Sequence, residues 1–182
     1  MHWILLLAIV LATMLAVLLL LLHRTTLGVM LGENIPDRPR RRLFLASVSF
    51  FLTFGIVRGM VYCITHGIPP FHYVLVDGRH IHHLVFGIFI LLGVGYGWLC
   101  DAGTGKYAAL AARLMSLLYG IGAALTLDEF ALWLNLKDVY FAREGRSSFD
   151  AIILFGSLLA IGAWGAPFFS ALFSGKASAR RP

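Results

Sequence analysis

The chain has 182 residues, of which 59% are hydrophobic, and its mean hydropathy is +0.84. A water-soluble domain of this length cannot bury so much apolar surface, so the composition indicates a polytopic membrane protein and excludes a soluble globular enzyme. The formal net charge is +6. The basic residues gather in short segments between apolar stretches, which is the pattern of a membrane protein and does not indicate a nucleic-acid partner.

Five stretches are apolar and long enough for membrane helices, since a crossing needs about 20 residues to span roughly 30 Å. They are residues 3–22, 43–64, 81–100, 107–135 and 150–173. We therefore expect an all-α fold in which residues 1–182 form a single bundle of five transmembrane helices. The first stretch lacks the basic start of a secretion signal and its apolar run is too long, so we expect a retained helix, with cleavage as the alternative.

The basic residues predict the orientation of this bundle. Ten of the fifteen lysine and arginine residues fall on one side of the five crossings: Arg24, Arg38, Arg40, Arg41, Arg42, Lys106, Arg113, Lys176, Arg180 and Arg181. The positive-inside rule assigns that side to the cytoplasm. We expect the N-terminus outside, an inner loop at 23–42, a basic cytoplasmic tail at 174–182 and contacts with membrane lipids. Cys63 and Cys100 would then lie a membrane apart, too far for a disulfide.

Histidines gather at the outer entrance of the third helix. The segment GRHIHHLVFG (78–87) contains His80, His82 and His83, and His72 lies in the loop before it. If these three histidines begin the helix, His80 and His83 are three residues apart and share a face, whereas His82 points elsewhere. His80 and His83 are therefore the expected ligand pair. His82 is a ligand of a second site, a group that supports the ligands, or a lipid-interface residue.

Three charged residues lie within the predicted helices at a depth close to these histidines. Asp128 and Glu129 are about 10 Å below the outer end of the fourth helix, and Arg58 is at a similar depth in the second. A charge inside a bilayer costs several kcal/mol unless it is paired or hydrated, so we expect all three to face the bundle interior. Asp128 and Glu129 diverge by about 100°, which favours different roles for them. One would bind a metal, and the other would accept a proton or pair with Arg58.

This combination of imidazoles and carboxylates is typical of a catalytic metal site. Zinc is the expected divalent metal, with iron or copper as alternatives, because three protein ligands and an open position let zinc activate a water molecule. The expected ligands are His80, His83, Asp128, His72 and His82. Glu129 would be the general base and Arg58 either catalytic or a counter-ion. Arg143 and Arg146 would bind a lipid phosphate.

Two segments resemble a known family. HIHHLVFGI (80–88) and GIGAALTLDEFALWLNLKDVYFAREGR (120–146) together resemble a family of uncharacterised bacterial integral membrane proteins. The resemblance covers about half of the chain and implies a bacterial inner-membrane protein, without an activity. The chemical idea of zinc held by His and Asp in a helical bundle also resembles alkaline ceramidase-type hydrolases. Those have seven helices and an HxxxH pair that this chain lacks, so no residue is carried over.

The sequence thus predicts a membrane-embedded, metal-dependent enzyme, a hydrolase of a lipid or amphiphile with its site in the outer leaflet. A redox enzyme with iron or copper is one alternative. A metal-binding sensor or chaperone is a second alternative, because it would need only the outer cluster. Metal or proton transport is a third, although a single protomer offers no polar path through the inner half, so a homo-oligomer would have to form one. In a structural alternative, Arg58 simply pairs with a buried carboxylate.

The glycines at 93, 95, 97, 120 and 122 are expected to pack the third and fourth helices closely.

Overall fold

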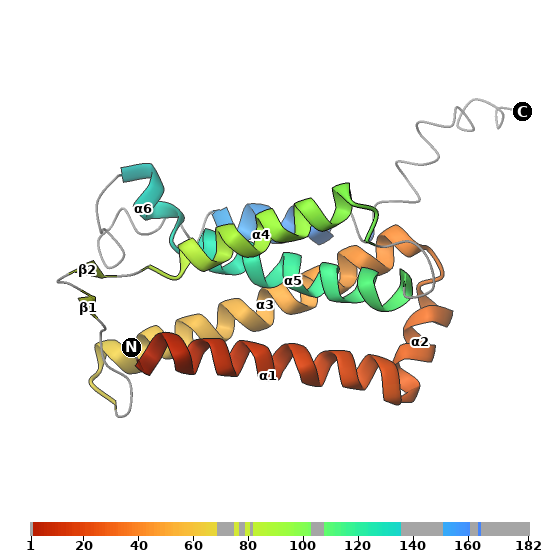
Figure 1. Cartoon of the computed structure of the whole chain (residues 1–182), viewed down its shortest axis with the longest axis horizontal. Helices are drawn as coiled ribbons and strands as arrows, with labels where there is room; N and C mark the ends of the chain where they lie inside the picture. Colours follow the sequence, from red (N-terminus) through yellow and green to blue (C-terminus); the bar gives the residue numbers. More distant parts are fainter. Residues whose placement is uncertain are drawn as a thin grey trace, which may run out of the picture.

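The computed structural model describes residues 2–68, 75–76, 79–80, 82–102, 108–135, 151–160 and 164. Its elements are α1 (His2–Arg24), α2 (Thr26–Asn34), α3 (Arg38–Thr65), β1 (Leu75–Val76), β2 (Arg79–His80), α4 (Leu84–Leu99), α5 (Ala108–Asp128) and α6 (Phe130–Asn135) (Figure 1). A further apolar helix, Ala151–Ala160, follows. The two short strands pair in antiparallel fashion, with Leu75 opposite His80. Apart from this pair of two-residue strands, the regular structure of the described residues is helical, which confirms the expected helical fold class for that part of the chain.

Three of the described helices are long and apolar enough to cross a membrane. They are Ile4–Arg24, Arg38–Thr65 and Ala108–Asp128, and they correspond to the first, second and fourth expected crossings. The helices Leu84–Leu99 and Ala151–Ala160 are apolar but shorter. The 16 residues of α4 extend about 24 Å. The chain is therefore a helical membrane protein by the length and composition of its helices.

Element boundaries differ from the prediction in two places. The expected helix over 107–135 is interrupted, because α5 ends at Asp128 and the short α6 begins at Phe130. The expected inner loop contains α2, whose first turn is capped by the Thr25 hydroxyl, which accepts a hydrogen bond from the backbone N–H of Leu27 at 3.2 Å. The hydropathy pattern showed only a connection here, so this short helix was not predicted.

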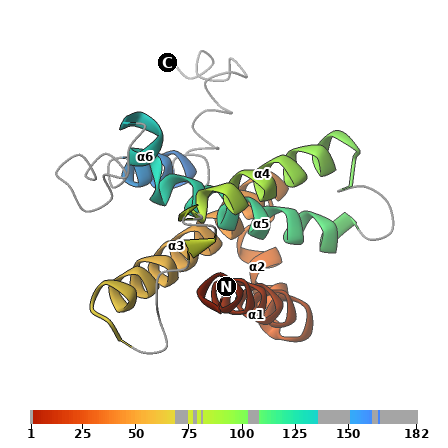
Figure 2. The same ribbon diagram turned by 60° about the vertical axis from the view of Figure 1, so that its left-hand side comes forward.

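Helix α5 lies between α3 and α4 and packs closely on both (Figure 2). A Cβ atom at Gly122 would lie 3.1 Å from the carbonyl oxygen of Gly87 on α4, and one at Gly120 would collide with Ser49 and Ala46 on α3. The predicted close packing of α4 and α5 is confirmed at Gly122 and at Gly97, where a Cβ atom would lie 3.1 Å from Met115 of α5. The prediction is wrong at Gly93 and Gly95, where a Cβ atom would meet no described atom within 4 Å, and Gly120 serves the contact with α3 instead. Glycine at the positions of close contact lets the helix backbones approach.

The ends of the helices define two ends of the bundle. The start of α1, the end of α3, the start of α4 and the end of α5 lie together at what we call the polar end, and α2 lies at the opposite end (Figure 1). At that opposite end, Arg113 Nη1 donates a 2.9 Å hydrogen bond to the carbonyl oxygen of Leu22 in the last turn of α1. A cation at a helix C-terminus satisfies an otherwise unpaired carbonyl and complements the helix dipole.

Candidate functional site

Five ionisable side chains meet at the polar end, and we call them the polar cluster. Arg58 lies two turns before the end of α3, and His82 and His83 are the two residues before α4. Asp128 is the last residue of α5, and Glu129 lies in the turn that follows it. They meet because α3 and α4 both pack on α5, so that the end of one helix faces the start of the next. His83, Asp128 and Glu129 are buried.

Arg58 and Asp128 form the closest ion pair of the cluster. Arg58 Nε lies 2.6 Å from Asp128 Oδ1, and Nη2 donates to the backbone carbonyl of Asp128 at 3.4 Å. The guanidinium also lies 5.3 Å above the ring of Phe54, one turn earlier on α3. Asp128 is completely buried, so its charge requires such a partner. The predicted pairing of Arg58 with one of the two carboxylates is confirmed, with Asp128 as its partner.

His83 lies between the two carboxylates, and only 4% of its side chain is exposed. Its Nε2 atom is 3.2 Å from Asp128 Oδ2, and its Nδ1 atom is 3.6 Å from Glu129 Oε1. Among the described residues, Nε2 has no hydrogen-bond partner, because the approach of Oδ2 lacks hydrogen-bond geometry. A buried polar atom without a hydrogen bond is rare, and a water molecule or an ion is among the groups that satisfy such an atom.

Glu129 connects two chain segments through both of its carboxylate oxygens. Oε1 lies 2.8 Å from His82 Nδ1, and Oε2 accepts a 3.0 Å hydrogen bond from the backbone N–H of Leu84. Leu84 is the first residue of α4. Its N–H is one of the donors that a helix cannot satisfy internally, and a carboxylate there also complements the helix dipole. Glu129 therefore helps to fix where α4 begins.

This capping corrects one step of the sequence interpretation. The third helix was expected to include residue 81 and to place His80 and His83 on one helical face, but α4 begins at Leu84 and His80 belongs to β2. The i, i+3 argument for this pair is therefore wrong. The contact between Glu129 and Leu84 was not predicted from the sequence. The requirement for an acceptor at each helix start was the signal for it.

The structure brings together Arg58, His82, His83, Asp128 and Glu129, which were all predicted as site residues. The side chains of His80 and His72, and the predicted phosphate ligands Arg143 and Arg146, lie outside the described residues. Within the described part of the chain, no group of three or more His, Cys, Asp or Glu side chains is arranged to hold a metal ion. The described part contains two adjacent atoms of the kind that bind metal ions, Nε2 of His83 and Oδ2 of Asp128.

Comparison of the chain with known protein families, with curated proteins and with solved structures finds no match. The functional interpretation therefore rests on the chemistry and the placement of the polar cluster.

Proposed function

We propose that the protein is a five-helix, multi-pass enzyme of the bacterial inner membrane, with its N-terminus outside, that uses a divalent metal to hydrolyse a lipid or amphiphile at the polar cluster. The observation that carries the proposal is His83 Nε2, which is buried in a membrane-spanning bundle, lacks a hydrogen bond among the described residues and faces a carboxylate oxygen at 3.2 Å. Ionisable groups within membrane segments are costly, and function is the usual reason that they are retained.

The spacing of these two atoms suits ligands of one metal ion. Nitrogen and oxygen atoms bound to tetrahedral zinc at 2.0–2.2 Å lie roughly 3.3–3.6 Å apart, close to the 3.2 Å between His83 Nε2 and Asp128 Oδ2. Around them, Arg58 holds the other oxygen of Asp128, and Glu129 lies beside the other nitrogen of His83. Supporting groups of this kind orient metal ligands. His80 and His72, which precede His83 in the chain, are the proposed remaining ligands.

When bound, zinc would supply a hydroxide at neutral pH. The chain's own residues then have separate roles. Arg58 neutralises Asp128, and Glu129 holds the imidazole of His82 through Nδ1. The side chain of His82 is 22% exposed, which makes it the member of the cluster best placed to exchange a proton with a substrate. Because both oxygens of Glu129 already have partners, Glu129 acts as the general base through its partner His82. Arg143 and Arg146 remain the proposed phosphate ligands.

The proposal is tested by elemental mass spectrometry of the detergent-purified protein. We expect about one zinc per chain in the wild type and its loss in His83→Ala and Asp128→Asn, because zinc needs its protein ligands. His66→Ala is the matched control, since His66 stacks on Tyr62 at the end of α3 and is not part of the cluster. Iron or copper in place of zinc would shift the proposal to redox chemistry. A metal-free wild type that stays metal-free after reconstitution would overturn it.

A structural role is the second candidate, and the Arg58–Asp128 ion pair favours it, because this pair already joins α3 to α5 without a further ligand. In that case the purified protein contains no metal. Replacement of His83 then lowers stability to the same extent whether or not zinc, iron or copper is added.

A further inference from the structure

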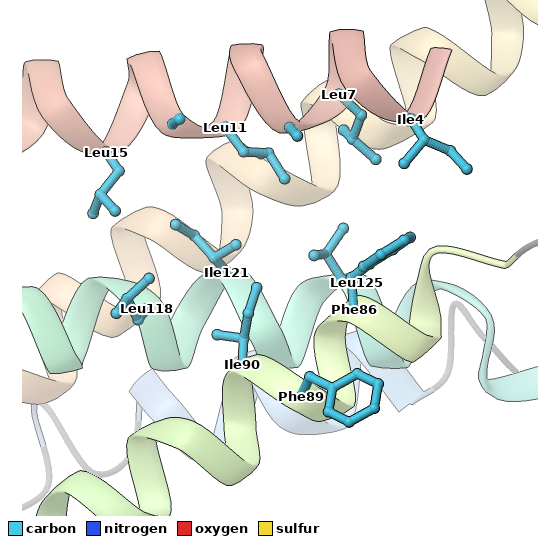
Figure 3. Close-up of a pocket in the computed structure, with 12 residues that line it drawn as sticks. Ile4, Leu7, Leu11, Leu15, Phe86, Phe89, Ile90, Leu118, Ile121 and Leu125 are labelled. Atoms are coloured by element: carbon cyan, nitrogen blue, oxygen red, sulfur yellow. The ribbon is translucent and has the colours of Figure 1, made fainter. Parts of the chain in front are cut away.

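A groove runs along the bundle between α1, α4 and α5. It encloses about 400 Å³, and its twelve lining side chains are all apolar. From α1, Leu7, Leu11 and Leu15 point toward α5, and Ile121 and Leu125 of α5 point back across the groove (Figure 3). Ring and aliphatic side chains of α4 form its third side. A groove with this lining offers no hydrogen bonds to water and suits apolar molecules.

The groove exists because α1 presents small residues where it faces the other helices. Ala8 and Ala12 lie one turn apart on the lining face of α1 and are exposed. Their methyl groups leave space that a larger side chain would fill. Leu7 and Leu11 are buried and hold α1 on the bundle. The helix is thus attached along one edge and stands away from the bundle along the other.

The length of the groove matches one leaflet of a bilayer. From Ile4 to Leu15 the lining of α1 spans twelve residues, whose eleven helical rises extend about 16 Å. Half of a hydrocarbon core is about 15 Å. Since the groove begins at the first turns of α1, it lies in the leaflet next to the polar end.

The lining of α5 leads directly to the polar cluster. Ile121 and Asp128 are seven residues apart and therefore share a helical face to within about 20°. On α4, Phe86 lines the groove three residues after His83. An amphiphile whose tail lies in the groove would have its polar part at the cluster.

We infer that the groove binds one acyl chain of a bilayer phospholipid, with the polar part of the lipid at the polar cluster. Any reaction at the lipid headgroup rests on the proposed function. For that function, the groove identifies the substrate class as a membrane lipid with a full-length acyl chain. Binding of the chain itself requires no metal, so the two proposals fail in different experiments.

The test is photocrosslinking in vesicles of phosphatidylethanolamine and phosphatidylglycerol, in which a fraction of the phosphatidylglycerol carries a diazirine in one acyl chain. We expect crosslinks concentrated on the groove faces of α4 and α5 and few on exposed Phe51 of α3. Ala12→Phe, which fills the groove, should reduce the α5 crosslinks at least several-fold. Ile9→Phe is the control, because Ile9 is exposed on α1 and does not line the groove.

A second measurement keeps the inference testable if Ala12→Phe does not fold. In the wild type, unlabelled long-chain phosphatidylglycerol should compete for the groove crosslinks, and a short-chain homologue should not. Crosslinks spread evenly over all exposed helix faces, or protein–protein crosslinks that place a second copy in the groove, would overturn the inference. Specific lipid crosslinks in a protein without metal would support lipid binding in the groove and contradict the proposed metalloenzyme. A zinc-containing protein with evenly spread crosslinks would support the metalloenzyme and contradict lipid binding in the groove.

Discussion

Arg58 Nε on α3 lies 2.6 Å from Oδ1 of Asp128, the last residue of α5. Asp128 is completely buried, so the pair joins two membrane-spanning helices through a charge that has little access to water. Such a pair adds little net stability compared with apolar residues of the same shape, but the loss of one partner leaves the other charge uncompensated. The stability of the bundle should therefore depend strongly on both partners being present.

Replacement of the guanidinium tests this dependence. Arg58→Met should lower the free energy of unfolding by about 3–5 kcal/mol, because the carboxylate of Asp128 loses its cation. The free energy is measured by denaturant titration in mixed micelles, followed by circular dichroism. The double variant Arg58→Met/Asp128→Leu should recover a large part of the loss, since it removes both charges. If the single and the double variant lost the same free energy of unfolding, the site would depend on the shape of the two side chains and not on their charges.

Glu129 should determine how firmly α4 is held at its start. Glu129→Ala removes the acceptor of the Leu84 N–H and the partner of His82, and we expect a loss of about 1–2 kcal/mol. Hydrogen exchange should accelerate in the first turn of α4, with little change in the middle of α3. Glu129→Gln retains one oxygen acceptor and should fall between the wild type and the alanine variant. Unchanged exchange at Leu84 would contradict the capping role.

The contact between α4 and α5 should tolerate no side chain at Gly87. A Cβ atom there would lie 2.7 Å from the carbonyl oxygen of Gly122, and overpacking of this kind typically costs 1–3 kcal/mol or more. Gly87→Leu is compared with Gly93→Leu on the same helix, because a Cβ at Gly93 meets no described atom within 4 Å. We expect the melting temperature to fall in the first variant only. Similar melting temperatures would mean that the helices can separate without loss.

The sequence was sufficient to predict the composition of the polar cluster. Hydropathy placed Arg58, Asp128 and Glu129 inside or at the ends of apolar stretches, and the number of crossings brought the histidines to the same end. The high cost of a charge in a bilayer then made pairing a reliable expectation, and the pair of Arg58 with Asp128 confirms it. Which carboxylate Arg58 would choose was not predictable, because Asp128 and Glu129 are adjacent and the answer depends on where α5 ends.

Other features depend on contacts between distant segments, and hydropathy does not report these. An apolar stretch shows where a helix fits in the bilayer but not at which residue it begins, so the capping of Leu84 by Glu129 was missed. The error moved the expected helix start by one turn and led to the incorrect pairing of His80 with His83 on one face. The groove was missed for the same reason, because the small size of Ala8 and Ala12 has meaning only once α1 is seen to face α4 and α5.

The native cysteines provide a test of the proposed orientation. Cys63 lies in the last turn of α3 at the polar end, and Cys100, which is exposed, directly follows α4 at the opposite end. The clustering of arginines around the start of α3 predicts that the opposite end faces the cytoplasm. A membrane-impermeant maleimide added to intact cells should therefore react with Cys63 and not with Cys100. The variant Cys100→Ser, which retains only Cys63, should be labelled, and the variant Cys63→Ser, which retains only Cys100, should not. Both variants should react after the membrane is permeabilised, which controls for burial of the thiol. Labelling of Cys100 in intact cells would place the polar cluster at the cytoplasmic face and move the proposed lipid site to the inner leaflet.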